Sequence, residues 1–121
     1  MKKYILLIAL AVSVLTAKAQ FNVDRLITSG KVALHYEDYV LSIQYFNQVI
    51  ALKPFLYEPW QYRAVAKFYL DDFVGAETDA SEAIALNPYI DILYDLRAIS
   101  RIRQEKYAGA IADYNKAIAI S

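Results

Sequence analysis

The chain has 121 residues, of which 58% are hydrophobic and 21% charged, and its thirteen basic residues balance its thirteen acidic ones. This length allows one small domain, and the neutral charge disfavours a nucleic-acid-binding protein, which needs a basic face. The sequence has no cysteine and a single histidine, His35. That composition excludes disulfides, Cys/His nucleophiles and zinc sites rich in histidine or thiolate.

Residues 1–19 are typical of a secretory signal peptide. Two lysines precede a largely apolar run over residues 4–15, and small residues follow at Ala17 and Ala19. As a helix this run rises about 18 Å, less than the roughly 30 Å of a hydrocarbon core, although a membrane anchor is the alternative. We expect cleavage after Ala19, no stable membrane insertion afterwards, and export to the periplasm of a Gram-negative bacterium or out of the cell.

A period of 34 residues runs through the rest of the chain, residues 20–121. The segment "VIALKP" at 49–54 recurs as "AIALNP" at 83–88, and "AIAIS" at 117–121 continues the series. Other sets keep the same spacing: Tyr39, Phe73 and Tyr107; Gly30, Ala64 and Ala98; Ser42, Ala76 and Ala110. A fixed period of this length indicates a stacked repeat architecture.

The period defines three units, at about 23–56, 57–90 and 91–121, of which the last is incomplete. Each unit is predicted to form two helices, because apolar residues recur at helical spacing on both sides of a short polar break. Asp72, in the break of the second unit, is a candidate N-cap, and Pro88 ends that unit. Strand alternation is absent, so the sequence predicts an all-α fold.

Small residues fall where the two helices of a unit are expected to cross, and they would let the helix axes approach closely. They are Gly30, Ala64 and Ala98 in the first helices, and Ser42, Ala76 and Ala110 in the second helices. Large aromatic side chains are expected to fill the spaces between the helices: Phe46, Trp60, Tyr94 and Tyr114. A leucine in place of Ala76 would then overpack the crossing.

These units resemble the tetratricopeptide repeat (TPR), a 34-residue helix–turn–helix unit. The matching residues are the aromatic ones at position 4 (Trp60, Tyr94), the small ones at positions 8 and 20 named above, and the prolines at position 32 (Pro54, Pro88). The departures are Leu26, Ala80 and Val49, with Ser29, Arg63 and Arg97 where the family usually has leucine. The resemblance covers nearly all of residues 20–121 and implies an α–α superhelix, or solenoid, of three repeats.

The resemblance also implies that the first helices line a concave groove that binds a protein or peptide segment. The groove residues carried over are Ile27, Lys31, Leu34, His35, Gln61, Val65, Phe68, Tyr69, Asp95, Ile99, Ile102 and Arg103, with Asp24, Glu58 and Ile92 beside them. Their apolar members would anchor an extended or helical peptide, unless neighbouring helices bury them. One subset of the family grips a C-terminal carboxylate, but only Lys31 is basic at the matching positions, so we do not expect that clamp.

Two of the departures from the family pattern occur together. Units two and three carry Arg63 and Arg97 at position 7 and Asp79 and Asp113 at position 23, whereas unit one has neither. We expect an arginine–aspartate pair between the two helices of each later unit. The alternative is two independent surface charges, and an exposed pair would add only about 0–1 kcal/mol.

No enzyme chemistry is indicated by the remaining polar residues. His35 is interpreted as a groove or surface residue, and the acidic pairs at 37–38 and 71–72 as turn and cap residues. No glycine-rich phosphate loop is present, so no cofactor is expected. We therefore expect a non-catalytic protein–protein interaction scaffold.

The end of the chain raises a second hypothesis of a different class. Tyr114, Ala117 and Ile118 would form an apolar stripe on the last helix, which no capping residue follows. The chain would then be a structural segment of a larger envelope protein that self-assembles, as a homo-oligomer, through this helix. Further repeats after Ser121 would cover the same stripe.

Overall fold

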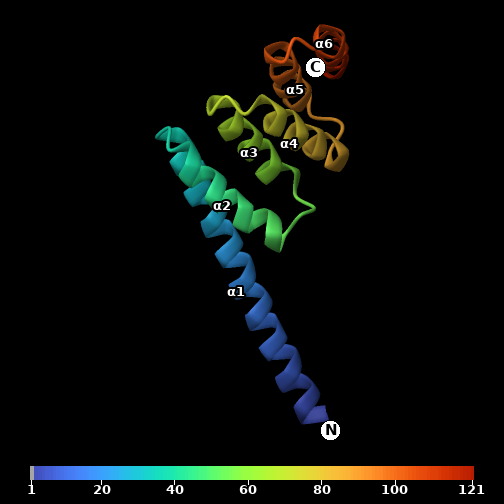
Figure 1. Ribbon diagram of the computed structural model, residues 1–121. Helices are drawn as coiled ribbons and strands as arrows, with labels where there is room; N and C mark the ends of the chain where they lie inside the picture. The colour runs from blue at the N-terminus through green and yellow to red at the C-terminus, as the bar shows by residue number, and fades with distance from the viewer. Residues whose placement is uncertain (1) are drawn as a thin grey trace.

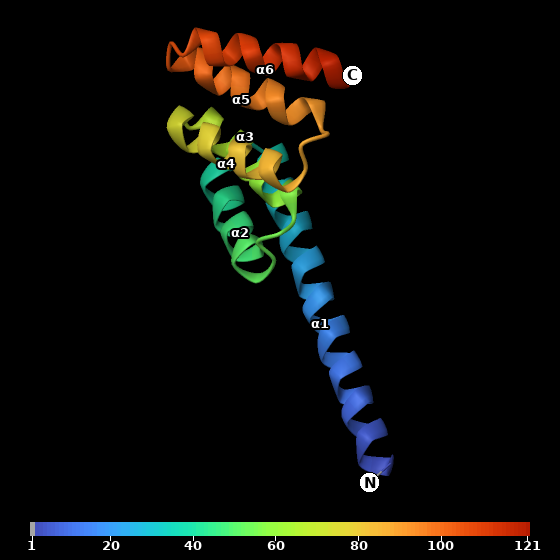
Figure 2. The ribbon, with the colours of Figure 1, turned by 90° about the vertical axis from the view of Figure 1, so that its right-hand side faces the viewer.

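The computed structural model describes residues 2–121, which form six α-helices and no strand. In chain order the helices are α1 (Lys2–His35), α2 (Tyr39–Leu52), α3 (Tyr57–Tyr69), α4 (Phe73–Leu86), α5 (Asp91–Arg103) and α6 (Tyr107–Ile120). They pack as three consecutive pairs, and each pair stacks on the next (Figure 1 and Figure 2). The predicted all-α solenoid of three helix–turn–helix units is therefore confirmed.

The first half of α1 extends away from the helix pairs (Figure 1). Within residues 2–121, α1 is the one helix long and apolar enough to cross a membrane, with an 18-residue window of mean hydropathy 1.8; a signal sequence at the start of a chain has the same character. The buried residues of α1 are Val23, Gly30 and Ala33. Cleavage after Ala19, which stays a prediction, would therefore remove none of them.

The turn inside each unit contains a residue with left-handed backbone geometry. These residues are Glu37, Asp71 and Glu105, with φ of 62°, 62° and 61°. Asp72 accepts a hydrogen bond from the backbone N–H of Gly75 at 2.9 Å, which confirms it as the N-cap of α4. Asp38 caps α2 in the same way, whereas Lys106 supplies no side-chain cap to α6.

The small residues lie buried at the helix crossings, as predicted from their spacing. The fully or almost fully buried ones are Ser42, Ala64, Ala76, Ala98 and Ala110. In unit one the Ser42 hydroxyl donates a hydrogen bond to the carbonyl oxygen of Gly30 at 3.0 Å. A Cβ atom on Gly30 would lie 2.7 Å from the ring of Phe46, so this crossing requires glycine. Of the four aromatic residues expected between the helices, Phe46 and Tyr94 are buried, whereas Trp60 and Tyr114 are only half-buried.

The predicted arginine–aspartate pairs are confirmed in units two and three. Arg63 and Arg97 each hold both carboxylate oxygens, of Asp79 at 2.8 Å and of Asp113 at 3.0 and 2.7 Å. The aspartates are not surface charges, because they are 1% and 3% exposed. A second cation lies at each carboxylate: Lys67 at 3.0 Å and Arg101 at 2.8 Å. Each pair is thus part of a buried cluster, and loss of one partner would leave an uncompensated buried charge.

The same arginines also join each unit to the one before it. Arg63 Nη1 donates a hydrogen bond to Asn47 Oδ1 of unit one at 2.9 Å. Arg97 Nη1 donates to the Ser81 hydroxyl of unit two at 3.3 Å. One guanidinium therefore positions its own helix pair and the preceding pair together.

A second polar contact between units two and three centres on Glu77 of α4. Its carboxylate accepts hydrogen bonds from Arg101, Gln104 and Lys106, each at 2.9 Å. Burial raises the pKa of Glu77, but the hydrogen bonds from these three side chains and the charge of Lys106 outweigh it and lower the pKa to about 2. The ionised carboxylate is therefore the form that holds α4 against unit three.

Candidate peptide-binding groove

A pocket of about 220 Å³ lies between α3 and α5, the first helices of units two and three. Its lining residues are Gln61, Val65, Phe68, Tyr69, Ile92, Asp95, Leu96 and Ile99. The wall is mainly apolar, and the Gln61 amide and the Asp95 carboxylate add polar groups. Whole small-molecule ligands take about 300–1,000 Å³, so this pocket suits a side chain of a larger partner.

Half of the predicted groove residues meet in this pocket. They are Gln61, Val65, Phe68, Tyr69, Asp95 and Ile99, and Ile92 joins them. Leu96 also lines the pocket but was not predicted, because its spacing is that of a core residue. It is 8% exposed and packs with Ala64 and Ala80, so only its edge reaches the pocket.

The predicted groove residues of α1 lie apart from this pocket. Lys31 and His35 line a separate, open hollow along α1, and Ile27 and Leu34 are half-buried. The Lys31 ammonium lies 5.5 Å from the ring centre of Tyr62 on α3. The structure therefore does not bring the α1 residues and the α3–α5 residues into one pocket.

A cation–π cluster lies beside the pocket. The guanidinium of Arg103 lies 5.4 Å from the ring centres of both Phe68 and Phe73, and the two rings meet edge-on at 5.3 Å. Because Arg103 is exposed and Phe68 lines the pocket, this contact holds a positive charge next to the apolar wall. Ile102, predicted together with Arg103, is exposed and does not line the pocket.

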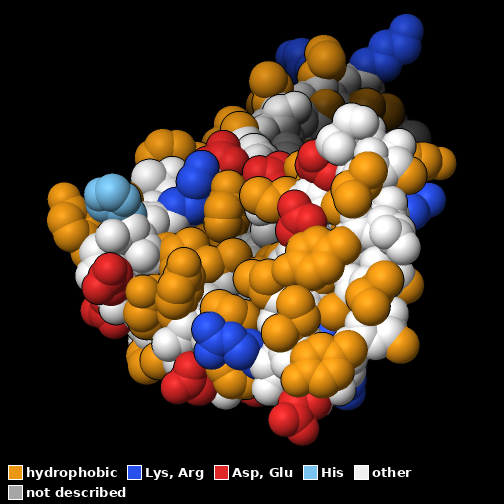
Figure 3. Space-filling model, turned by 90° about the horizontal axis from the view of Figure 1, so that it is seen from above, with side chains coloured by type: hydrophobic (Ala, Val, Ile, Leu, Met, Phe, Trp, Pro, Cys, Tyr) orange, Lys and Arg blue, Asp and Glu red, His pale blue; other side chains and the backbone are white. Residues whose placement is uncertain are grey.

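The surface around these helices is mixed in character. Figure 3 shows hydrophobic side chains gathered over the face seen from above, with separate acidic and basic side chains among them. Within residues 2–121 no group of three or more histidine, aspartate or glutamate side chains is placed to hold a metal ion. This surface offers apolar contacts and separate charges, which suit non-covalent contact with another molecule.

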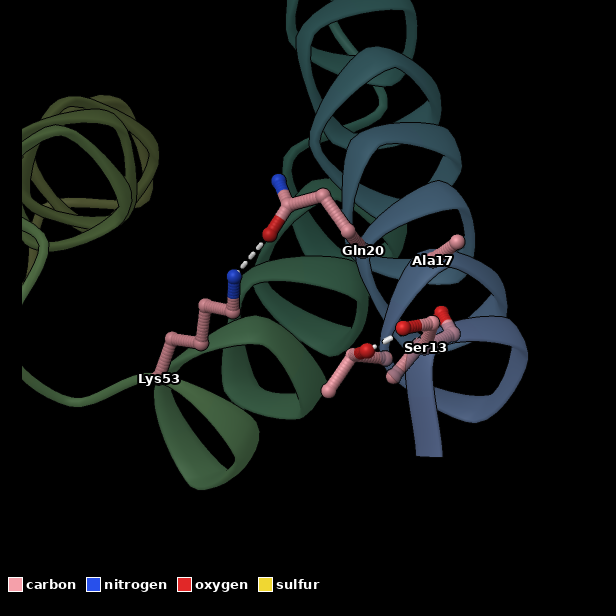
Figure 4. A pocket seen from close by; sticks show the side chains of 6 residues that line it. Ser13, Ala17, Gln20 and Lys53 are labelled. Atoms are coloured by element: carbon pink, nitrogen blue, oxygen red, sulfur yellow. Dashed lines mark hydrogen bonds between the residues drawn. The ribbon is translucent and has the colours of Figure 1, made fainter. Parts of the chain in front are cut away.

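A second hollow lies between α1 and the end of α2 (Figure 4). Lys53 donates a hydrogen bond to the side-chain oxygen of Gln20 at its edge. Its other lining residues are Ser13, Thr16, Ala17 and Ala19. All four belong to the segment that the sequence predicts to be cleaved, and cleavage would remove them.

No protein-family model matches the chain, and no curated protein matches it. Solved structures do match. The first TPR of Spaghetti (RPAP3), bound to the HSP90 peptide SRMEEVD, has a TM-score of 0.80 and 25% identity, over 82% of this chain and 79% of that chain. MamA has a TM-score of 0.82 and 25% identity over 90% of this chain, which spans 63% of the MamA chain. The Arabidopsis OM64 TPR domain has a TM-score of 0.80 and 21% identity, over 82% of each chain. The chain therefore has the tetratricopeptide-repeat fold.

Proposed function

We propose that the chain is a non-catalytic scaffold that binds an extended or helical segment of a partner protein across α3 and α5. The observation that carries this proposal is the apolar pocket between the two helices. Tyr69 and Ile92, which line it, are 59% and 52% exposed. Large apolar side chains left exposed around a hollow are typical of a docking surface.

The charges beside the pocket define the segment that fits best. An apolar anchor would enter between Val65 and Ile99, an acidic residue of the segment would lie toward Arg103, and a basic one toward Asp95. The Spaghetti TPR domain is bound to a peptide, and the shared fold supports peptide binding as the class of activity. This chain is not proposed to grip a C-terminal carboxylate, because only Lys31 is basic at the positions of that clamp.

A displayed peptide library tests this proposal with the purified full chain. We expect selected peptides to share an apolar residue flanked by charges, and to lose binding to a Tyr69→Ala/Ile92→Ala variant. The matched control is Tyr89→Ala/Val74→Ala, which removes an aromatic and an aliphatic side chain that are more exposed and lie outside the pocket. Circular dichroism verifies that both variants are folded. If the two variants bind the selected peptides equally well, the pocket between α3 and α5 is not the binding site.

We also propose that the chain is exported and loses residues 1–19. The charged start, apolar run and small residues of this segment support the proposal, and none of the buried residues of α1 lies in it. Expression of the full chain in a bacterium followed by intact-protein mass spectrometry gives a direct test. We expect a mature protein that begins at Gln20. A full-length chain retained in the membrane fraction would instead support the anchor alternative.

A further inference from the structure

The side-chain amide of Gln20 lies between two opposite charges. The ammonium of Lys53 donates a hydrogen bond to the amide oxygen, Oε1. The amide nitrogen, Nε2, donates a hydrogen bond to Oδ1 of Asp24 at 2.9 Å. Figure 4 shows the side chains of Lys53 and Gln20 directed toward each other across the space between α1 and the end of α2. Both polar atoms of this amide are therefore held by charged groups.

The packing of unit one fixes these two charged groups. Lys53 directly follows α2, and its backbone N–H donates a hydrogen bond to the carbonyl oxygen of Val49 at 2.7 Å. Val49 is fully buried, and Val23, which precedes Asp24 in α1, is 2% exposed. Removal of residues 1–19 therefore leaves Lys53 and Asp24 on the same framework, with Gln20 as the new first residue.

A glutamine at the amino terminus carries a nucleophile and an electrophile in one residue. Its free amine reaches Cδ of its own side chain through a five-membered ring, so the reaction is intramolecular and needs no second reactant. The amine nitrogen forms a bond to Cδ, the bond between Cδ and Nε2 breaks, and Nε2 leaves as ammonia. The product is pyroglutamate, a lactam that has no basic amine.

Lys53 and Asp24 match the charge and proton movements of this reaction. Negative charge develops on Oε1 while Cδ is tetrahedral, and Oε1 is the atom to which the Lys53 ammonium donates. The attacking amine loses one proton, and the departing Nε2 gains one. The Asp24 carboxylate lies at Nε2, so it is placed to take the proton from the amine and deliver it to the leaving nitrogen.

The cyclised product also suits the start of α1. The positive end of the helix macrodipole disfavours an ammonium group at a helix N-terminus, and the lactam removes that charge. Lys53 places a further positive charge beside the same residue. The charges around Gln20 therefore favour the cyclised terminus over the free amine.

We propose that the mature amino terminus is a modification site, at which Gln20 cyclises to pyroglutamate. Lys53 stabilises the oxyanion in this reaction, and Asp24 carries the proton. The product has no free α-amine, so peptidases that require one cannot shorten α1. This inference rests on the proposed removal of residues 1–19 and is independent of the α3–α5 pocket.

The test expresses the full chain in a bacterium, purifies the processed protein at once and follows its amino-terminal peptide by mass spectrometry over days. Cyclisation is measured as the loss of ammonia. A synthetic peptide with the sequence of residues 20–27 retains Asp24 but lacks Lys53. One donor to a developing oxyanion contributes about 10²–10³-fold in an enclosed site, so at this exposed one we expect the protein to convert at least about tenfold faster than the peptide.

Lys53→Met should lower the rate of the protein to that of the peptide, and Asp24→Asn should lower it by about tenfold or more. Lys116→Met is the matched control, because Lys116 is exposed on α6 and, within residues 2–121, that helix does not contact α1. The control should convert at the unaltered rate, and circular dichroism verifies that all variants are folded.

The outcomes separate this inference from the processing on which it rests. A mature chain that begins at Gln20 and keeps its ammonia would overturn the inference alone. An equal rate for Lys53→Met and the unaltered protein would do the same. A chain that begins at a different residue would overturn the proposed processing and this inference with it.

Discussion

Replacement of Arg97 by methionine tests directly what holds unit three together. The guanidinium binds both carboxylate oxygens of Asp113, at 3.0 and 2.7 Å, and Asp113 is 3% exposed. Methionine keeps much of the aliphatic stem but leaves the buried carboxylate with Arg101 as its one remaining cation. Loss of one partner of a buried ion pair costs about 3–5 kcal/mol. Because Arg101 remains, we expect a loss near the lower end, about 3 kcal/mol.

The measurement is urea unfolding followed by far-ultraviolet circular dichroism. Arg25→Met is the matched control, since Arg25 is exposed and forms no ion pair within residues 2–121, and it should change stability by less than about 0.5 kcal/mol. The double variant Arg97→Met/Asp113→Leu removes the buried charge together with its partner. We expect it to be more stable than the sum of the two single changes by at least about 1 kcal/mol.

Two results would refute this reasoning. A loss below about 1 kcal/mol for Arg97→Met would show that Arg101 alone satisfies Asp113. Additive effects in the double variant would show that the two side chains contribute independently, as separate surface charges would. Either result would mean that the pair contributes no more to the free energy of unfolding than an exposed ion pair, about 0–1 kcal/mol.

Four further changes have defined outcomes. Ala76→Leu overpacks a fully buried crossing and should lower stability by about 1–3 kcal/mol; an unchanged melting curve would contradict this packing. Glu105→Gly relieves a left-handed residue and should raise the free energy of unfolding, measured by urea titration, by up to about 1 kcal/mol, which is the strain relieved less the entropy of glycine. Glu77→Gln should cost stability above pH 4.5 but progressively less as pH falls toward 2, because the folded pKa of Glu77 is lowered from 4.5 to about 2; a gap independent of pH would refute this linkage. Leu96→Tyr should fill the α3–α5 pocket and abolish binding of selected peptides while the chain stays folded, and retained binding would place the ligand elsewhere.

The repeat period explains which parts of the fold were predictable. A pattern that recurs at the same position of several units can be recognised within a single sequence. An arginine at position 7 together with an aspartate at position 23 is an example. The depth of these residues was not predictable in the same way, because period and spacing carry no measure of burial. The predicted pairs were therefore valued as exposed ones, although the packed helices enclose Asp79 and Asp113.

Two features of the structure were not predicted from the sequence. Glu77 stands where the other units have Ile43 and Ile111, and its partners lie 24 to 29 residues later in the next unit. The left-handed turn positions, such as Asp71 and Glu105, are occupied by acidic residues rather than by glycine, so composition gave no indication of positive φ. In both cases tertiary packing overrides what the local sequence indicates.

In the candidate groove, too, packing between units decides what the repeat pattern does not. The difference arises at one position of the repeat. The resemblance placed groove residues on all three first helices, but one pocket accommodates only those of α3 and α5. Position 6 accounts for the difference. In unit two it is Tyr62, whose ring fills the space against α1 and α2, stacked on Phe46 and lying 5.5 Å from the Lys31 ammonium. In unit three it is the shorter Leu96, which leaves the hollow open. A single side chain at each junction between units therefore decides whether an anchor site exists there.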